Sequence, residues 1–388
     1  VSMVKLKASY GLVGNDQIGG DRRFIYNETV IGGGKYYFGT TPSQYTSVRL
    51  GEFPNPNVGW EKAKKLNLGA DLSFFNQLNI SVDYFKENRE GIFLQRKSIP
   101  MYVGLSTKPW VNIGKMRNSG IDASLEYHQP LGKDLHLTVR GNFTYARNRI
   151  MDQDEPDYAY TYMNRSGQMQ WQKFGLVAVG LFQDQEDIDS WTKQSFGEVK
   201  PGDIKYLDLN GDGIVDSYDT KPIGYSDIPE IVYGFGFSLQ WKAFDLSAFF
   251  QGVAHVNFST LTDQTQAFVG RNLKESSVFA DLYGNTWTPE NPGAKYPRMT
   301  TGAVDNNNQL STFWMADGRY LRLKNLELGY TLPKRIANKI AMQNLRVYLS
   351  GVNLFTFSPF KLWDPDLQTG ATNYPNNRII NLGLTIGF

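Results

Sequence analysis

The chain has 388 residues, of which 41% are hydrophobic and 14% aromatic, and its 40 basic and 38 acidic side chains give a net charge of +2. This balance does not indicate a nucleic-acid binder. The absence of cysteine excludes disulfides, thiolate catalysis and cysteine-ligated zinc sites. The mean hydropathy of −0.41 is that of a soluble protein, but strands that alternate apolar and polar residues hide their apolar face from any average along the chain.

Apolar and polar residues alternate through much of the first half of the chain, with the period of two that is typical of a strand. The pattern occupies residues 4–10, 66–74, 78–84, 121–127 and 135–145. Such a strand has one apolar and one polar face. No stretch approaches the ~18 continuous apolar residues that a membrane-spanning helix needs.

The second half continues the alternation at residues 231–241, 244–250, 319–332, 345–349 and 378–388. Its phase changes near Asn325, which predicts a β-bulge there, and residues 334–342 have a brief helical pattern. The last strand alternates up to the aromatic Phe388. We therefore expect about ten strands, each close to the ~9–11 residues that a tilted strand needs to cross a bilayer.

The connections between these strands alternate between short and long. The short ones are residues 76–77, 128–134, 242–243 and 333–343; the long ones are 13–61, 94–116, 149–228, 258–317 and 357–377. A soluble β-sandwich has no physical reason to sort its loops in this way, whereas an outer-membrane barrel has short periplasmic turns and long extracellular loops. The sequence therefore predicts an all-β fold, a transmembrane antiparallel β-barrel that begins and ends on the periplasmic side.

Residues that would face the barrel interior are small in several strands, as at Gly234, Gly236 and Ser238 and at Gly383 and Thr385. Glycine eases the curvature and closure of a sheet, and small residues also make room for something inside the barrel, such as a plug. A ten-stranded barrel standing alone would be narrow and filled by its own side chains. The small residues therefore favour a wider parent barrel.

Several segments resemble one family when they are taken in order. They are FPNPNVGWEKAKKLNLGAD at 53–71, FFNQLNISVDYF at 74–85, NIGKMRNSGID at 112–122, LELGYTLPK at 326–334, LRVYLSGVNLFTF at 345–357 and WDPD at 363–366. The chain is similar along its whole length to TonB-linked outer-membrane proteins of the SusC/RagA type. We find no plug, no TonB-contacting segment and no signal peptide in it. We therefore expect residues 1–388 to be the C-terminal portion of such a barrel.

The resemblance implies a 22-stranded, multi-pass barrel in the bacterial outer membrane, with a plug domain inside and a SusD-like lipoprotein as its surface cap. It implies that TonB, acting through the plug, drives the import of glycans or peptides in Bacteroidetes. Outer-membrane lipid and a dimer of the transporter–lipoprotein pair are further expected partners. Nucleic acid is not an expected partner.

Residues 208–219, DLNGDGIVDSYD, form a calcium-loop pattern inside the long loop 149–228. Gly213 stands at the sixth position, where such a loop turns sharply. The expected ligands for a structural Ca²⁺ are the side-chain oxygens of Asp208, Asn210, Asp212, Asp216 and Asp219 and the backbone carbonyl of Ile214. The alternative is an acidic turn that binds no metal.

Aromatic residues are frequent in the long loops, where flat rings can stack on sugars or anchor protein interfaces. The tryptophans there are Trp110, Trp171, Trp191, Trp287, Trp314 and Trp363, and Tyr158, Tyr160 and Tyr162 follow at intervals of two. Loop packing and the interfacial aromatic girdle are the alternatives, and we assign Trp60, Trp241 and Trp314 to the girdle. The loop arginines Arg165, Arg271 and Arg298 either meet an acidic partner or are solvated.

We expect no enzyme, and therefore no catalytic or cofactor-binding residues. The rival class is a complete small barrel that acts as a passive porin, an adhesin or a surface protease. A protease site needs acid–base partners at the outer rim, but His128 and His136 lie near the periplasmic end, and we assign His255 a structural role. The sequence contains no G-x-S-x-G and no H-E-x-x-H motif. Sequence upstream of Val1 would distinguish the classes.

Overall fold

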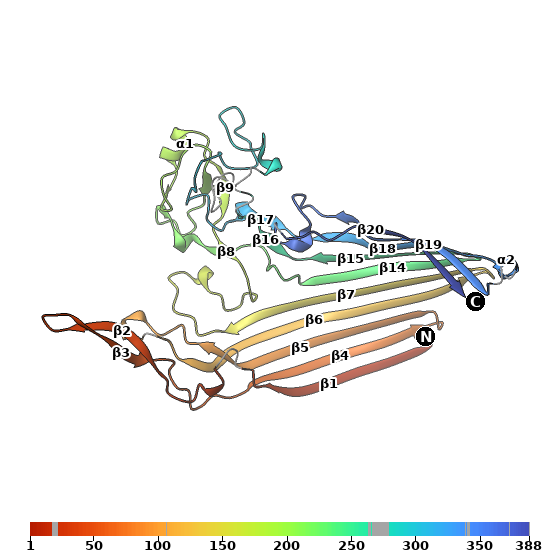
Figure 1. Cartoon of the computed structure of the whole chain (residues 1–388), viewed down its shortest axis with the longest axis horizontal. Coiled ribbons are helices and arrows are strands. Elements are labelled where there is room, and N and C mark those ends of the chain that lie inside the picture. Colours follow the sequence, from red (N-terminus) through yellow and green to blue (C-terminus); the bar gives the residue numbers. More distant parts are fainter. Residues whose placement is uncertain are drawn as a thin grey trace.

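The structure is a computed structural model that describes residues 1–388 except 18–21, 106, 263–264, 266–278, 338, 340–341, 372 and 388. Its main element is a ten-stranded antiparallel sheet, shown in Figure 1. The strands are β1 (Met3–Asn15), β4 (Glu61–Phe74), β5 (Leu78–Gln95), β6 (Trp110–Leu131), β7 (Leu135–Asp152), β14 (Ile231–Trp241), β15 (Phe244–Ala254), β18 (Tyr320–Thr331), β19 (Asn344–Phe357) and β20 (Ile379–Gly387). All ten predicted strands are confirmed.

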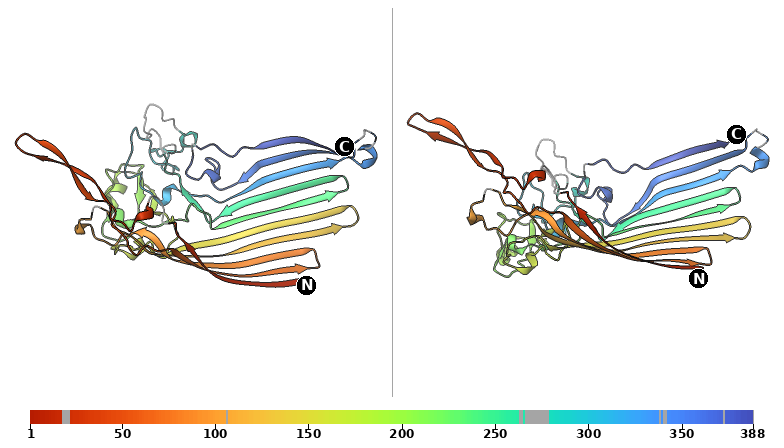
Figure 2. Two further views of the ribbon diagram at one scale, coloured as in Figure 1. Left: turned by 60° about the horizontal axis from the view of Figure 1, so that its bottom comes forward. Right: turned by 90° about the horizontal axis from the view of Figure 1, so that it is seen from below.

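The strands lie side by side in chain order, β1-β4-β5-β6-β7-β14-β15-β18-β19-β20. Short turns connect them at one end, where both termini also lie, and the long connections gather at the other end (Figures 1 and 2). The predicted sorting of loops is therefore confirmed. The sheet is open, since within the described residues β1 and β20 each pair on one side only.

The predicted bulge is confirmed at Asn325, because the register shifts between Leu323 and Asn325 on the side of β19 and at the same place on the side of β15. The predicted helical pattern at 334–342 yields only α2 (Lys334–Ala337). Residues 338 and 340–341 of that pattern lie outside the described residues, as does the terminal aromatic Phe388.

Three neighbouring strands are longer than the sequence indicated. β5, β6 and β7 have 18, 22 and 18 residues, well beyond the ~9–11 that cross a bilayer. Most of their extra length lies at the loop end, where apolar–polar alternation gives way to a more polar ladder that continues the backbone hydrogen bonds. The connection expected at 94–116 therefore shrinks to residues 96–109.

The long connections contain secondary structure of their own. The first contains an exposed hairpin of β2 (Val30–Phe38) and β3 (Ser43–Leu50), which projects from the loop end (Figure 2). The others contain β8 (Phe174–Gly175), β9 (Ala178–Leu181), α1 (Gln185–Ser190), β10 (Lys193–Gln194), β11 (Ile204–Tyr206), β12 (Ile214–Val215), β13 (Lys221–Pro222), β16 (Asn257–Ser259) and β17 (Met315–Asp317). Within the described ranges, no helix is both long enough and apolar enough to cross a membrane.

The two faces of the sheet differ in chemistry because cross-strand register places like residues side by side. One row that crosses six strands consists of Leu137, Leu239, Leu246, Leu328, Leu349 and Leu382. The adjacent row, on the opposite face, consists of Thr138, Ser238, Ser247, Glu327, Ser350 and Asn381. We call the apolar face the outer face and the polar face the inner face.

Candidate functional site

The inner face carries ion pairs that join neighbouring strands. The Lys7 Nζ atom lies 2.7 Å from Asp71 on β4 and 3.2 Å from Asp83 on β5. At the other side of the sheet, the Arg346 guanidinium bridges Asp245 and Glu327, so that β15, β18 and β19 are tied together. The charges of the inner face are thus largely paired within the sheet. This is typical of a solvated structural surface and not of a catalytic one.

The small inner residues have a third role that the sequence did not reveal. A Cβ atom at Gly234 would lie 2.8 Å from the ring of Phe249, and one at Gly383 would lie 2.1 Å from the ring of Tyr348. The glycines therefore leave space for large side chains of the adjacent strand, which lie flat over them. This explanation does not require an object in the lumen.

The two longest loops fold together into a lobe at the loop end of the sheet, which we call the loop lobe (Figure 1). Its apolar core combines residues from both loops: Leu176, Leu181, Ile204, Tyr206 and Val215 from the first and Leu282, Trp287, Tyr296 and Trp314 from the second. Trp314 is only 3% exposed in this core. Its assignment to the lipid-facing girdle was therefore wrong, whereas Trp60 and Trp241 are exposed.

A buried carboxylate connects the two halves of the loop lobe. Asp203 is fully buried and accepts hydrogen bonds from Arg298 Nε at 2.8 Å and from the Asn307 amide at 2.8 Å. Burying a carboxylate is costly unless a cation and hydrogen bonds compensate it, and here both come from the second loop. Arg298 is therefore an internal cross-link and not a contact for an acidic partner.

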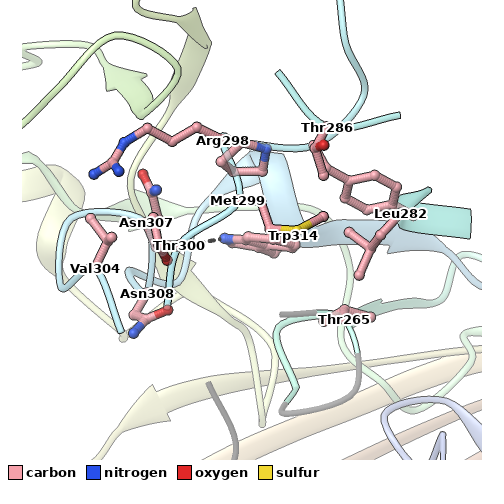
Figure 3. A pocket seen from close by; sticks show the side chains of 12 residues that line it. Thr265, Leu282, Thr286, Arg298, Met299, Thr300, Val304, Asn307, Asn308 and Trp314 are labelled. Carbon is pink, nitrogen blue, oxygen red and sulfur yellow. Dashed lines mark hydrogen bonds between the residues drawn. The ribbon is translucent and has the colours of Figure 1, made fainter. Parts of the chain in front are cut away.

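Figure 3 shows a small cavity beside this cross-link, lined by Arg298, Met299, Asn307, Leu282 and Trp314 among others. The Trp314 indole N–H donates to the Asn307 carbonyl at 2.8 Å on its wall. The cavity of about 40 Å³ holds little more than water. It belongs to the packing of the loop lobe and is too small for a nutrient.

The predicted calcium residues share one loop, but its oxygens serve backbone groups of that same loop. Asp208 accepts from the N–H groups of Gly211 and Gly213 at 2.7 and 3.0 Å. Asp219 is fully buried and accepts from Leu209 at 2.7 Å. Within the residues that the structure describes, no group of three histidine, cysteine, aspartate or glutamate side chains is arranged as metal ligands.

The other predicted ligands are engaged in the same way. Asn210 Oδ1 accepts from the Asp212 N–H at 3.0 Å, and Asp212 in turn accepts from the Ile214 N–H at 2.9 Å. Asp216 caps a short 3₁₀ turn by accepting from Tyr218 at 2.7 Å. The arrangement is a network of Asx turns, which is compatible with both predicted alternatives.

Most of the loop tryptophans pack against the protein. Trp110 stacks on Phe93 with ring centroids 5.5 Å apart, and the Trp191 indole donates to the Tyr206 carbonyl at 2.9 Å. Trp363 packs edge-on against Phe360, and Trp287 is buried. Trp171 differs from all of these, because 62% of its surface is exposed.

Trp171 lines a hollow where the loop ends of β4 to β7 meet the first loop of the loop lobe. The hollow has a volume of about 420 Å³, within the usual range of ligand pockets. Its lining includes Glu87, Arg89, Asn118 and Asn148 from the strands. The hollow combines an exposed aromatic ring with convergent polar groups on the inner face.

Two charged clusters at the junction of sheet and loops escaped the sequence analysis. Glu230, only 4% exposed, lies between Arg147, at 2.5 and 2.8 Å, and His255, at 3.1 Å. The His255 ring stacks on Tyr225 at 4.5 Å, as the structural role assigned to this histidine requires. Only the spatial meeting of β7, β14 and β15 brings these groups together, so no local pattern signals them.

The second cluster explains the WDPD segment. Arg322 on β18 is 1% exposed and binds both Asp364 and Asp366 of that segment. Asp366 also accepts a hydrogen bond from the Tyr320 hydroxyl. The two aspartates therefore anchor the last long loop to the sheet.

A curved antiparallel sheet with an apolar outer face, a polar inner face and its long loops at one end is the wall of an outer-membrane β-barrel. Residues 26–354 match the family described as TonB dependent receptor-like, beta-barrel, and the chain belongs to this family. It is therefore an outer-membrane protein, from a family of transporters rather than of enzymes.

Two curated relatives support this assignment. TonB-dependent receptor P3 of Formosa agariphila is 30% identical over 99% of this chain, and TonB-dependent receptor SusC of Bacteroides thetaiotaomicron is 26% identical over 100% of it. These matches cover 39% and 38% of the two relatives. The chain thus spans about two fifths of the length of the curated relatives that it matches.

A solved structure shares the fold. The RagAB peptide importer in its open-open state aligns with a TM-score of 0.73 at 22% identity, over 100% of this chain and 40% of the matched chain. The predicted resemblance to SusC/RagA-type barrels is confirmed by these matches.

Proposed function

We propose that this chain forms the C-terminal part of the barrel of a SusC/RagA-type transporter that imports glycan or peptide nutrients across the outer membrane. The observation that carries the proposal is the sheet itself, with leucines outside, neutralised polar side chains inside and every long loop at one end. Such a wall encloses a polar path through an apolar bilayer. The family assignment and the likeness to SusC and RagAB support it.

The proposal includes the partners that such a transporter needs. A SusD-like lipoprotein would cap the loop end, and TonB would supply energy through the plug domain of the complete protein. The loop lobe has a packed apolar core and lies at the loop end of the sheet, where a cap would bind. A dimer of the transporter–lipoprotein pair is part of the same proposal.

Deletion of the gene for the complete protein tests this function. We expect the deletion strain to lose uptake of one class of glycan or peptide. In wild-type cells, uptake of that class should stop when the proton gradient is collapsed. Uptake that persists without the gradient would indicate a passive porin. Unchanged uptake in the deletion strain would indicate an adhesin or a surface protease instead.

We also propose that Ca²⁺ stabilises the loop at 208–219. The support is the donor set, since carboxylate and amide oxygens at alternate positions suit a hard cation, and ordering so long a loop is costly without a cross-link. Asp208, Asn210, Asp212, Asp216 and Asp219 would supply side-chain oxygens and Ile214 its carbonyl. The ion would act structurally, not in chemistry.

Thermal melting and limited proteolysis with and without a chelator test the calcium proposal. We expect chelation to lower the melting temperature and to open cleavage sites in the loop lobe, and Asp212→Ala to abolish this response. Asp189→Ala, in the exposed helix α1 of the same loop, should leave it intact. Identical melting and cleavage in both conditions would contradict a calcium site.

A further inference from the structure

We propose that Trp171 and the hollow beneath it bind a neutral oligosaccharide at the outer mouth of the barrel. This inference rests on the import function proposed above and narrows its substrate class. It is carried by the geometry of the hollow, by the way in which the chain presents Trp171, and by the charge balance of the lining.

The floor of the hollow is a row of polar side chains in register. Glu87, Asn118 and Asn148 line it and face one another across β5, β6 and β7, and Arg89 follows on β5 one step nearer the loops. Their carboxylate, guanidinium and amide groups are flat and point to the inner face. Flat groups with two donors or acceptors can engage adjacent hydroxyls of a sugar in pairs of hydrogen bonds.

Trp171 is held over this floor by an unusual backbone. Its φ angle is +65°, a conformation that costs a bulky residue energy and persists only where the surroundings impose it. The neighbouring residues supply that constraint. The Gln170 N–H donates to Asn148 at 2.6 Å, and the buried Gln172 amide donates to Ile223 and Gly224 at 3.0 and 3.1 Å. The backbone that carries the exposed indole is thus held in place, which lowers the entropy lost on binding a ligand.

The charges of the lining favour a neutral ligand. Arg89 is paired with Glu87 at 2.9 Å and with Glu61 at 3.4 Å, and Lys65 is paired with Glu87 at 3.3 Å. The lining contains two acids and one base, and Lys65, which adjoins it on β4 opposite Glu87, balances the second acid. A charged ligand would have to break these pairs. A sugar ring instead offers a C–H face to the indole and hydroxyls to the floor.

An extended peptide fits the hollow less well. Peptides bound as added strands need an unpaired backbone edge, but β4 to β7 are hydrogen-bonded to neighbours on both sides. The charged termini of a short peptide would also need partners in a lining whose charges are already paired. A peptide is therefore the alternative that the test must reject.

The test uses the complete transporter with its natural partner, purified in detergent. Calorimetry measures its binding of neutral oligosaccharides of four to eight sugars (α-glucan, β-glucan, mannan, xylan and galactan) and of uncharged peptides of similar length. We expect one saccharide class to bind, Trp171→Ala to weaken it about tenfold or more, and Trp171→Phe to retain part of the affinity. Melting temperatures should stay unchanged, because the indole is exposed.

Trp60→Ala is the matched control. Trp60 is similarly exposed, at 65%, and lies near the same end of the barrel. It packs against Gly14, however, and Gly14 stands at a position of β1 that belongs to the outer face. Its removal should leave saccharide binding unchanged. Binding of peptides but of no saccharide in the panel, or equal binding by Trp171→Ala and wild type, would overturn the inference.

Cellular uptake separates this inference from the transport function. If Trp171→Ala cells import the nutrient normally while deletion cells do not, transport stands and the saccharide site is wrong. If deletion cells also import normally, the proposed function itself is wrong.

Discussion

Glycines on the inner face leave space that atoms of the neighbouring strands occupy. The tightest contact with main chain in β14 is at Gly236, where a Cβ atom would lie 2.4 Å from the carbonyl oxygen of Ala248. A backbone atom within a paired strand cannot move aside as a flexible side chain can. Packing at this position is therefore set by the sheet and not by the lumen.

Gly236→Ala should destabilise the barrel by about 1–3 kcal/mol, the usual cost of overpacking. Gly141→Ala, in the adjacent strand β7, is the control, since its Cβ atom would meet nothing closer than 3.7 Å. Urea unfolding in detergent micelles measures both variants. Equal stability of the two variants would mean that the sheet adjusts freely at Gly236.

Asp154 anchors the loop between β5 and β6. Burial alone would raise the pKa of its carboxyl, but the backbone N–H of Ser98 and the guanidinium of Arg96 outweigh burial and hold that pKa at about 2, below the ordinary 3.8. A carboxyl with a lowered pKa stabilises the fold above its ordinary pKa and loses that contribution as pH falls from 3.8 towards 2. The anchor should therefore be at full strength at every pH above about 5.

Hydrogen exchange of the loop at 96–109 tests this anchor. In the wild type we expect constant protection between pH 5 and 8, and in Asp154→Asn reduced protection already at neutral pH, because the bond to Arg96 loses its charge. Asp157→Asn, at an exposed position nearby, should behave as wild type. Unchanged protection in Asp154→Asn would show that the backbone alone orders the loop.

The strands are the elements that sequence predicts best. Period-two alternation located all ten, because a strand with one lipid face and one polar face must alternate wherever it crosses the bilayer. The phase change at Asn325 located the bulge for the same reason. The extensions of β5 to β7 were missed because outside the bilayer nothing enforces alternation.

The facing of the strands can be tested at two adjacent residues of β19. Leu349 is 50% exposed on the outer face, whereas Ser350 lies on the inner face opposite Glu327. Leu349→Arg should cost about 2–4 kcal/mol if it lies near the bilayer midplane, and Ser350→Arg should be tolerated because it gains an acidic neighbour. Folding yield in outer membranes measures both, and similar damage from the two changes would contradict the assigned faces.

The loop lobe could not be predicted because its contacts join distant segments. The Gln194 amide, for example, donates to Asn306 at 2.6 Å across 112 positions of sequence. Its strands have only two to four residues, too few to show a period. The interior tryptophans and Arg298 were therefore indistinguishable in sequence from exposed loop residues.

Arg298→Ala should loosen the loop lobe without unfolding the sheet. It leaves Asp203 buried without a cation, and breaking a buried pair costs about 3–5 kcal/mol; the partial exposure of Arg298 places the expected cost near the lower limit. Protease cleavage within residues 153–230 should accelerate. Arg165→Ala, which removes only a cation–π contact with Phe174 at 4.4 Å, is the control, and equal cleavage of both variants would contradict the cross-link.

At the scale of the whole molecule, the sequence predicted the barrel wall and its membrane, but not the hollow beneath Trp171. The sequence around this tryptophan does not distinguish it from the other five in the loops. Its exposure depends on which distant segments of the folded chain pack against it. The calcium loop stays a prediction. Its residues are adjacent in sequence, so the pattern was visible, but a network of Asx turns satisfies the same oxygens without an ion.

We infer that the outer face of the sheet meets lipid and that its inner face meets water. Because this chain contains no cysteine, a spin label can be placed at single cysteines along 345–356 in the complete transporter, reconstituted in bilayers, once any cysteine outside residues 1–388 has been replaced by serine. We expect accessibility to oxygen and to a water-soluble nickel complex to alternate residue by residue, with oxygen favoured at Leu345, Val347 and Leu349. Accessibility without a period of two, or apolar positions shielded from both reagents, would contradict it.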